Sequence, residues 1–177
     1  DDGSEKGSGL LRHAVAGCLN AMAGSTLIFA PHANSYDRMV PGSHAPTAIC
    51  WGYENRTAAL RIPSGSPSAR RIEHRVAGGD VNPYLTIAAV LGAALNGIED
   101  GEDPKSEPIT GNAYKLDAPH IPGDWRTAID MFEASPEVKR IFAPDLIRNL
   151  VLTKRQELHY MQELSPTEQA EIYLDTV

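Results

Sequence analysis

The spacing of apolar residues along the chain predicts several helices and one group of short strands. A segment of small and apolar residues over 10–23 predicts a first helix. The clearest helix begins at Asn82 and Pro83, because Asn is a good N-cap and Pro suits the first helical position. We expect the apolar face of this helix to lie in the core. Its residues recur at spacings of three and four: Leu85, Ala88, Leu91, Leu95 and Ile98.

A different pattern, rich in residues typical of strands, lies between these two helices. It predicts strands over 47–53, 57–62 and 71–76, with a turn at Glu54 and Asn55 between the first two. We expect these strands to be antiparallel and to pack against the helices. Residues 96–123 are rich in Gly, Pro and acidic residues, which predicts a long surface connection.

The last third of the chain carries helical signals. Asp124 is a candidate N-cap, Ser135 precedes a proline that can start a short helix, and one apolar face runs through 144–164. Residues 165–168 form a capping-box pattern for a final helix. The order of helix, strands and helices predicts an α+β fold and not a doubly wound α/β fold.

Composition narrows the function classes. The chain has 177 residues, 42% of them hydrophobic, which is enough for one domain with a sizeable core. Its formal charge of −7 disfavours general binding to nucleic acid or to anionic membrane, and no apolar run approaches the roughly 18 residues that span a bilayer. Cys18 and Cys50 match no metal-binding spacing. We therefore expect a protein of a reducing, cytoplasmic compartment, with a secreted chain holding one disulfide as the alternative.

Positive charge is concentrated in one part of this acidic chain. The window 38–75 contains six arginines, no lysine and only two acidic residues, Glu54 and Glu73. The planar guanidinium group suits bidentate binding of carboxylates and phosphates, so the window predicts a site for a small polyanion. A set of structural ion pairs is the alternative. The six are Arg38, Arg56, Arg61, Arg70, Arg71 and Arg75.

The predicted strand 71–76 carries the most specific arrangement. Because side chains alternate across a strand, Arg71, Glu73 and Arg75 share one face, and the two arginines are about 13 Å apart. His74 points to the other face with apolar residues, and we interpret it as a packed histidine. From spacing alone, Glu73 either neutralises the arginines or holds a magnesium ion bridging phosphate oxygens. Arg61 adds to this site from the preceding strand.

Several segments in order resemble the glutamine synthetase superfamily. They are NSYDRMVPG at 34–42, NRTAALRIP at 55–63, ARRIEHR at 69–75 and NPYL at 82–85, with EIYL at 171–174 similar to the terminal helix of the family. In that family, ATP phosphorylates the γ-carboxylate of glutamate, and an amine then displaces the phosphate. The resemblance implies an ATP-dependent carbon–nitrogen ligase with ATP and Mg²⁺ or Mn²⁺ as cofactors.

The resemblance also implies roles for single residues. Arg38 would hold the glutamate carboxylate, Arg56 would face the transferred phosphoryl group, and Arg75 would stabilise the acyl phosphate. Arg61 and Arg71 would lie along the ATP phosphates. It further implies that Glu73 ligates the metal that bridges those phosphates, which favours the second of the two readings above.

The chain departs from glutamine synthetases proper at two positions. His44 stands where they have a glutamate that binds ammonium, and a histidine does not attract a small cation. Ser68 stands where many members have a lysine near the nucleotide. Segments 72–80 and 109–114 resemble the γ-glutamyl-polyamine ligase branch, so we favour an organic amine, with His44 acting as a neutral base. An exposed loop residue without a role is the alternative reading of His44.

The resemblance also bears on domain organisation. Residues 1–177 correspond to the carboxyl-terminal part of a catalytic domain, and the polar, glycine-rich start without Met fits the middle of a loop. Removal of a pro-segment is the alternative. The amino-terminal β-grasp domain and the first half of the catalytic domain would precede residue 1, so we expect the fragment alone to be inactive and the full-length protein to be a homo-oligomer. Two rival functions remain: ammonia-dependent glutamine synthetase and a non-catalytic regulatory homologue.

Overall fold

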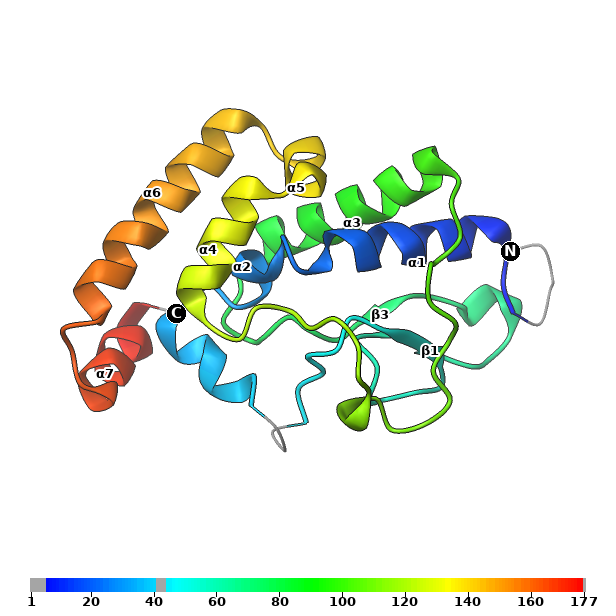
Figure 1. The fold of residues 1–177 in the computed structure, drawn as a ribbon, viewed down its shortest axis with the longest axis horizontal. Helices are drawn as coiled ribbons and strands as arrows, with labels where there is room; N and C mark the ends of the chain where they lie inside the picture. Colours follow the sequence, from blue (N-terminus) through cyan, green and yellow to red (C-terminus); the bar gives the residue numbers. More distant parts are fainter. Residues whose placement is uncertain (1–5, 41–43, 177) are drawn as a thin grey trace.

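The computed structural model describes residues 6–40 and 44–176, and it has helices packed around a small sheet (Figure 1). This α+β architecture is the predicted one. The strands are β1 (Trp51–Tyr53), β2 (Leu60–Ile62) and β3 (Glu73–His74), and the 3-10 helices are η1 (Ala33–Arg38), η2 (Pro67–Ala69) and η3 (Ala113–Lys115). The α-helices are α1 (Gly9–Met22), α2 (Thr26–Phe29), α3 (Pro83–Asp100), α4 (Trp125–Ala134), α5 (Pro136–Ile141), α6 (Pro144–Met161) and α7 (Pro166–Thr176). None of the helices among these residues is both long and apolar enough to cross a membrane.

Helices α1 and α3 lie side by side along the top of the sheet (Figure 1). Helix α3 packs through the small residues Ala89, Ala93 and Gly97, which are its buried positions. The prediction that Leu91 and Leu95 lie in the core is wrong, because 64% and 54% of their surfaces are exposed. Two positions along a helix differ by about 200° in direction, so burial of the small residues turns these leucines outward.

The sheet has the order β1-β2-β3 and differs from the prediction in one pairing. Strands β2 and β3 are antiparallel as expected, but β1 and β2 are parallel, with Trp51 opposite Leu60. The expected antiparallel turn at Glu54 and Asn55 is instead a loop that returns the chain to the start of the next strand. Glu54 adopts a left-handed φ of 51°, and the Ala58 amide bonds the Asn55 carbonyl. These two features reverse the chain twice within the loop.

The predicted surface connection 96–123 is partly built into the fold. The Ile109 amide donates to the Trp51 carbonyl at 2.8 Å, and Ala48 forms an isolated antiparallel bridge with His120. A second, smaller cluster of buried apolar residues lies beneath this segment and includes Cys50 and Ala113. Residues 47–49, predicted as the start of a strand, therefore pair with residues 119–121, whereas the Cys50 carbonyl accepts from the Leu60 amide of β2 at 3.1 Å.

The carboxyl-terminal helices follow the capping signals of the sequence. Asp124 accepts a hydrogen bond from the Thr127 amide at 2.9 Å and caps α4, and Ser135 caps α5. Glu168 accepts from the Ser165 amide at 2.8 Å, and the Ser165 hydroxyl accepts from the Glu168 amide at 3.4 Å, so both bonds of the expected capping box at α7 are present. Phe132 and Val151, both fully buried, join α4 and α6 to the main core.

Candidate functional site

Glu73 lies between two arginines at the edge of the sheet. Arg61 on β2 is directly opposite Glu73 on β3, and its Nη1 donates to Glu73 Oε2 at 2.9 Å. Arg75 Nη1 donates to Glu73 Oε1 at 2.6 Å. All three side chains are half-buried or more, and the hydrogen bond from Arg75 and the charge of Arg61 outweigh burial and lower the pKa of Glu73. Glu73 is therefore an ionised carboxylate held by two guanidinium groups.

Glu54 is a member of this cluster that the sequence reasoning placed only in a turn. Its Oε2 accepts from Arg61 Nη2 at 2.9 Å, and its Oε1 accepts from the Ser64 amide. These bonds, first that from the Ser64 backbone and then that from Arg61, lower the pKa of Glu54 to about 2. The parallel register of β1 and β2 brings Glu54 beside Arg61. The antiparallel pairing expected from the sequence does not predict this contact. Two arginines and two glutamates make the cluster electrically neutral.

Arg56 and Arg71 are exposed and lie close along the chain to Glu54 and Glu73 of this neutral cluster. Arg71 makes its only hydrogen bond among the described residues to the Ala69 carbonyl, so it does not join Glu73 as the alternation of 71–76 predicted. The short pairing of β3 with β2 explains this difference, because β3 contains only residues 73 and 74 and begins after Arg71. Both guanidinium groups are thus available to an incoming anion.

The loop that carries Arg56 is fixed from a distant part of the chain. The side-chain amide of Asn55 donates to the carbonyls of Ile109 and Gly111 at 2.9 and 2.8 Å, and its oxygen accepts from Thr57. Thr57 Oγ1 in turn accepts from the Ala113 amide at 2.9 Å. The residues on either side of Arg56 are therefore structural anchors for its position.

Arg38 lies at the end of η1, beside the segment that leaves β3. Its Nη2 donates to the carbonyl of Val76 at 2.7 Å and to that of Phe29 at 3.0 Å. Ser35, also on η1, donates to the carboxylate of Asp80. Burial lowers the pKa of Arg38, and the charge of Asp80 opposes this. The backbone bond to Val76 places Arg38 one residue from Arg75.

His44 is exposed and adopts a left-handed φ of 63°. Its carbonyl accepts a hydrogen bond from the Tyr114 hydroxyl at 2.8 Å, and the two rings meet edge to face with centroids 6.3 Å apart. The segment 109–114 therefore contacts both the Arg56 loop and His44. The sequence marks this segment only by its resemblance to the polyamine ligases, and its hydrogen bonds to Asn55, Thr57 and His44 depend on the folded structure.

His74 takes the place that the alternation predicted. Its ring packs against Phe29 with centroids 4.5 Å apart, on the side of the strand away from Arg61 and Arg75. Burial lowers its pKa to about 4, so the ring is neutral at physiological pH. It is a packed histidine.

These residues carry donor groups of the kinds that a metal site and a phosphate site require. Among the described residues, no group of three or more His, Cys, Asp or Glu side chains could hold a metal ion. Glu73 fits as one ligand, because each of its oxygens retains a lone pair after binding an arginine. A metal site that included Glu73 would need further ligands from outside residues 6–40 and 44–176.

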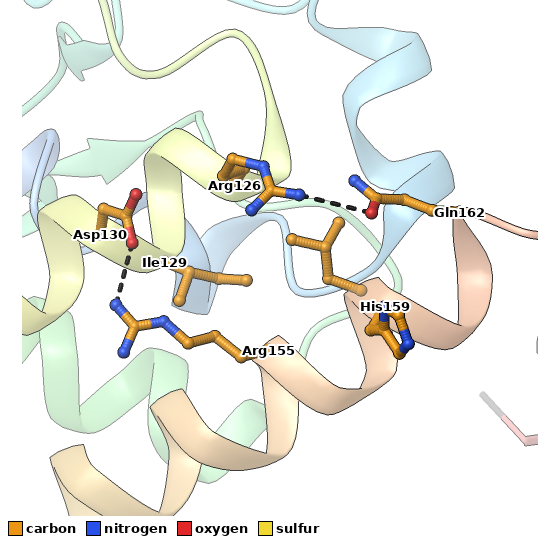
Figure 2. Close-up of a pocket in the computed structure, with 7 residues that line it drawn as sticks. Arg126, Ile129, Asp130, Arg155, His159 and Gln162 are labelled. Carbon is orange, nitrogen blue, oxygen red and sulfur yellow. Dashed lines mark hydrogen bonds and ion pairs between the residues drawn. The ribbon is translucent and has the colours of Figure 1, made fainter.

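A separate hollow of about 180 Å³ lies between α4 and α6 (Figure 2). Arg155 reaches across it to Asp130 at 2.9 Å, and Arg126 donates to Gln162 at 3.3 Å. Each arginine thus bonds a residue of the other helix or of its C-cap. None of the predicted site residues lines this hollow.

The chain is an α+β domain that carries an arginine–carboxylate cluster at the edge of its sheet, and comparison with known proteins identifies its family. The profile described as "Glutamine synthetase, catalytic domain" matches residues 1–173. The chain belongs to this family. It is 44% identical over 151 residues to γ-glutamylethanolamide synthetase GlnA4 of Streptomyces coelicolor, covering 85% of this chain and 32% of that protein.

Other relatives agree with this assignment. The chain is 36% identical over 163 residues to γ-glutamylputrescine synthetase PuuA of Escherichia coli, which covers 92% of this chain and 34% of that protein. The solved structure of GmaS without ligand aligns with a TM-score of 0.80 at 28% identity, covering 99% of this chain and 40% of that one. The chain thus spans about a third of the length of the curated relatives it matches.

Proposed function

We propose that this chain is the carboxyl-terminal part of the catalytic domain of an ATP-dependent ligase that joins an organic amine to the γ-carboxylate of glutamate. The observation that carries the proposal is the Arg61–Glu73–Arg75 cluster, found in a chain of the glutamine synthetase family. Phosphoryl transfer needs little covalent chemistry from the protein and relies on positioning and charge neutralisation. Arginines held by a carboxylate provide a rigid arrangement for both.

The arginines take three different parts in this proposal. Arg61 and Arg71 bind the ATP phosphates, and Arg56 and Arg75 neutralise the charge that develops on the transferred phosphoryl group and on γ-glutamyl phosphate. Arg38 binds the glutamate carboxylate. Glu73 supplies one ligand to Mg²⁺ or Mn²⁺, a divalent ion that neutralises phosphate charge when bound. The amine then attacks the acyl phosphate, and phosphate leaves.

An organic amine is favoured over ammonia by two observations. The chain is 44% identical to a γ-glutamylethanolamide synthetase, compared with 34% to the glutamine synthetase of Aquifex aeolicus. His44 also lacks the fixed negative charge that ammonium requires. Ammonia-dependent glutamine synthetase is the second candidate, and a non-catalytic homologue is the third. We further propose that the complete subunit is cytoplasmic, since Cys18 and Cys50 are buried and unpaired, and that it assembles as a homo-oligomer.

The experiment measures γ-glutamyl product and ADP with glutamate, Mg²⁺, ATP and either ethanolamine, putrescine or ammonium. The complete subunit is expected to ligate an organic amine, and Glu73→Gln is expected to lower kcat at least about a hundredfold because it removes charge from the cluster. Glu163→Gln is the matched control, since Glu163 is exposed on the turn after α6 and forms no ion pair among the described residues. Absence of product with every amine would refute the proposed activity.

A further inference from the structure

Tyr173 on α7 joins two parts of the chain that lie 140 residues apart. Its buried hydroxyl accepts a hydrogen bond from the Ala33 amide at 3.2 Å and donates to Glu157 Oε1 on α6 at 3.1 Å. Its ring packs against His32 with centroids 4.6 Å apart. Helix α7 therefore lies beside η1, as Figure 1 shows, and holds the first residue of η1 through one side chain.

Glu157 fixes the direction of the Tyr173 hydroxyl. Its Oε1 also meets His32 Nδ1 at 3.4 Å, and its Oε2 accepts from Lys154 Nζ at 2.7 Å. Burial raises the pKa of Glu157, but the hydrogen bonds from His32, Lys154 and Tyr173 outweigh burial and hold the pKa below its ordinary value. An ionised carboxylate only accepts, so the hydroxyl hydrogen points at Glu157 and the oxygen lone pairs face Ala33.

The other end of η1 carries Arg38, which is bonded to the carbonyls of Phe29 and Val76. A six-residue 3-10 helix has poor hydrogen-bond geometry of its own, so its position depends on contacts with other segments, which include the bond from Ser35 to Asp80 and the bonds at its two ends. A hollow of about 480 Å³ lies between η1 and α7, lined by Asn34, Arg38, Asp80 and Leu174 among others. Packing between η1 and α7 is thus sparse, so the hydrogen bond between Tyr173 and Ala33 is a main contact between them.

We propose that Tyr173 is a positioning residue for glutamate: through Ala33 it holds η1, so that Arg38 is presented to the substrate carboxylate. The inference rests on the proposed function, which assigns Arg38 to glutamate. The Arg61–Glu73–Arg75 cluster is held by its own ion pairs on the sheet. Loss of the Tyr173 hydroxyl therefore weakens glutamate binding and leaves ATP binding and the chemical step largely unchanged.

The test replaces Tyr173 with phenylalanine in the complete subunit. Tyr173→Phe keeps the ring against His32 and removes only the hydroxyl. The KM for glutamate is expected to rise about fivefold, the effect of one net hydrogen bond, while the KM for ATP and kcat change less than about twofold. Hydrogen exchange of the amides over 33–39 is expected to speed up. Tyr160→Phe is the control, because Tyr160 is 55% exposed and its hydroxyl has no partner among the described residues.

Two results would overturn this role for Tyr173. One is unchanged exchange over 33–39 in Tyr173→Phe, which would show that the hydroxyl does not hold η1. The other is an equal rise of the KM for glutamate and for ATP, which would indicate general destabilisation. A wild-type subunit without ligase activity would refute the proposed function, and the exchange comparison would still decide whether Tyr173 fixes η1.

Discussion

Gly17 of α1 and Gly97 of α3 touch backbone to backbone: a Cβ atom on Gly17 would lie 2.6 Å from the Gly97 amide nitrogen. A Cβ atom on Gly97 would in turn lie 2.1 Å from the carbonyl oxygen of His13. Neither neighbour is a flexible side-chain end, so the two helices must separate to admit a methyl group. This contact sets the distance between the longest helices that cover the sheet.

We therefore expect Gly97→Ala to destabilise the chain by about 1–3 kcal/mol, the usual effect of overpacking. Gly123→Ala is the control, since a Cβ atom there meets nothing within 4 Å and the residue has no left-handed φ. Urea unfolding followed by circular dichroism measures both. Equal midpoints for Gly97→Ala and Gly123→Ala would show that the helices tolerate a wider separation.

His74 predicts a specific dependence of stability on pH. Burial lowers its pKa from 6.5 to about 4 in the folded chain, so the unfolded chain binds the proton more readily between these values. The stability gained by keeping the ring neutral is complete above about pH 6.5 and is lost as the pH falls towards 4, by on the order of 3 kcal/mol.

The free energy of unfolding at pH 7 and at pH 4.5 tests this. His74→Leu is expected to remove most of the difference between the two values, whereas His159→Leu, at an exposed position on α6, is expected to retain it. The same slope in wild type and His74→Leu would assign the titration to another group.

The amine preference of the complete subunit is expected to depend on His44. A neutral histidine suits an alkylammonium whose far end is bound elsewhere, whereas ammonium needs a fixed negative charge. His44→Glu should therefore shift the ratio of kcat/KM towards ammonium by roughly tenfold. An unchanged ratio would remove His44 from the site, and a wild-type preference for ammonium would contradict the organic-amine proposal itself.

Helix α3 exposes four large apolar residues along one stripe: Tyr84, Ile87, Leu91 and Leu95, each at least 54% exposed. Exposed apolar stripes of this kind promote association. The 177-residue chain is expected to self-associate, and Leu91→Gln with Leu95→Gln should shift it towards monomer in light scattering. Leu152→Gln, at a 58% exposed leucine on α6, is the control. A monomeric wild-type chain would show that the stripe does not drive association.

Local signals in the sequence were sufficient for most of the fold. The caps at Asp124 and Ser135 act through residues three positions away, and they were predicted correctly. The core face of α3 was not, because periodicity finds a stripe of large apolar residues and gives no weight to Ala89, Ala93 and Gly97. Their burial depends on the partner helix α1, which a local pattern does not contain.

The site shows the same division. The alternation of side chains along a strand predicts that Glu73 and Arg75 share one face with Arg61 and that His74 lies on the other. The structure has this arrangement. Glu54 was missed because its contact requires the parallel register of β1 and β2. Arg71 was placed on the strand face, but the ladder ends before it. Both errors concern pairings between segments, which a single strand pattern does not specify.

The bonds from residues 109–114 to Asn55 and to His44 have a consequence for how acceptor choice diverges among related enzymes. A change in the length of the segment before Ile109 would move Tyr114, and with it the backbone of His44, while the arginines on the sheet stayed in place. Selection for a new amine then has a target remote from the arginines on the sheet. We therefore expect insertions and deletions over 101–108 to accompany changes of amine among related enzymes.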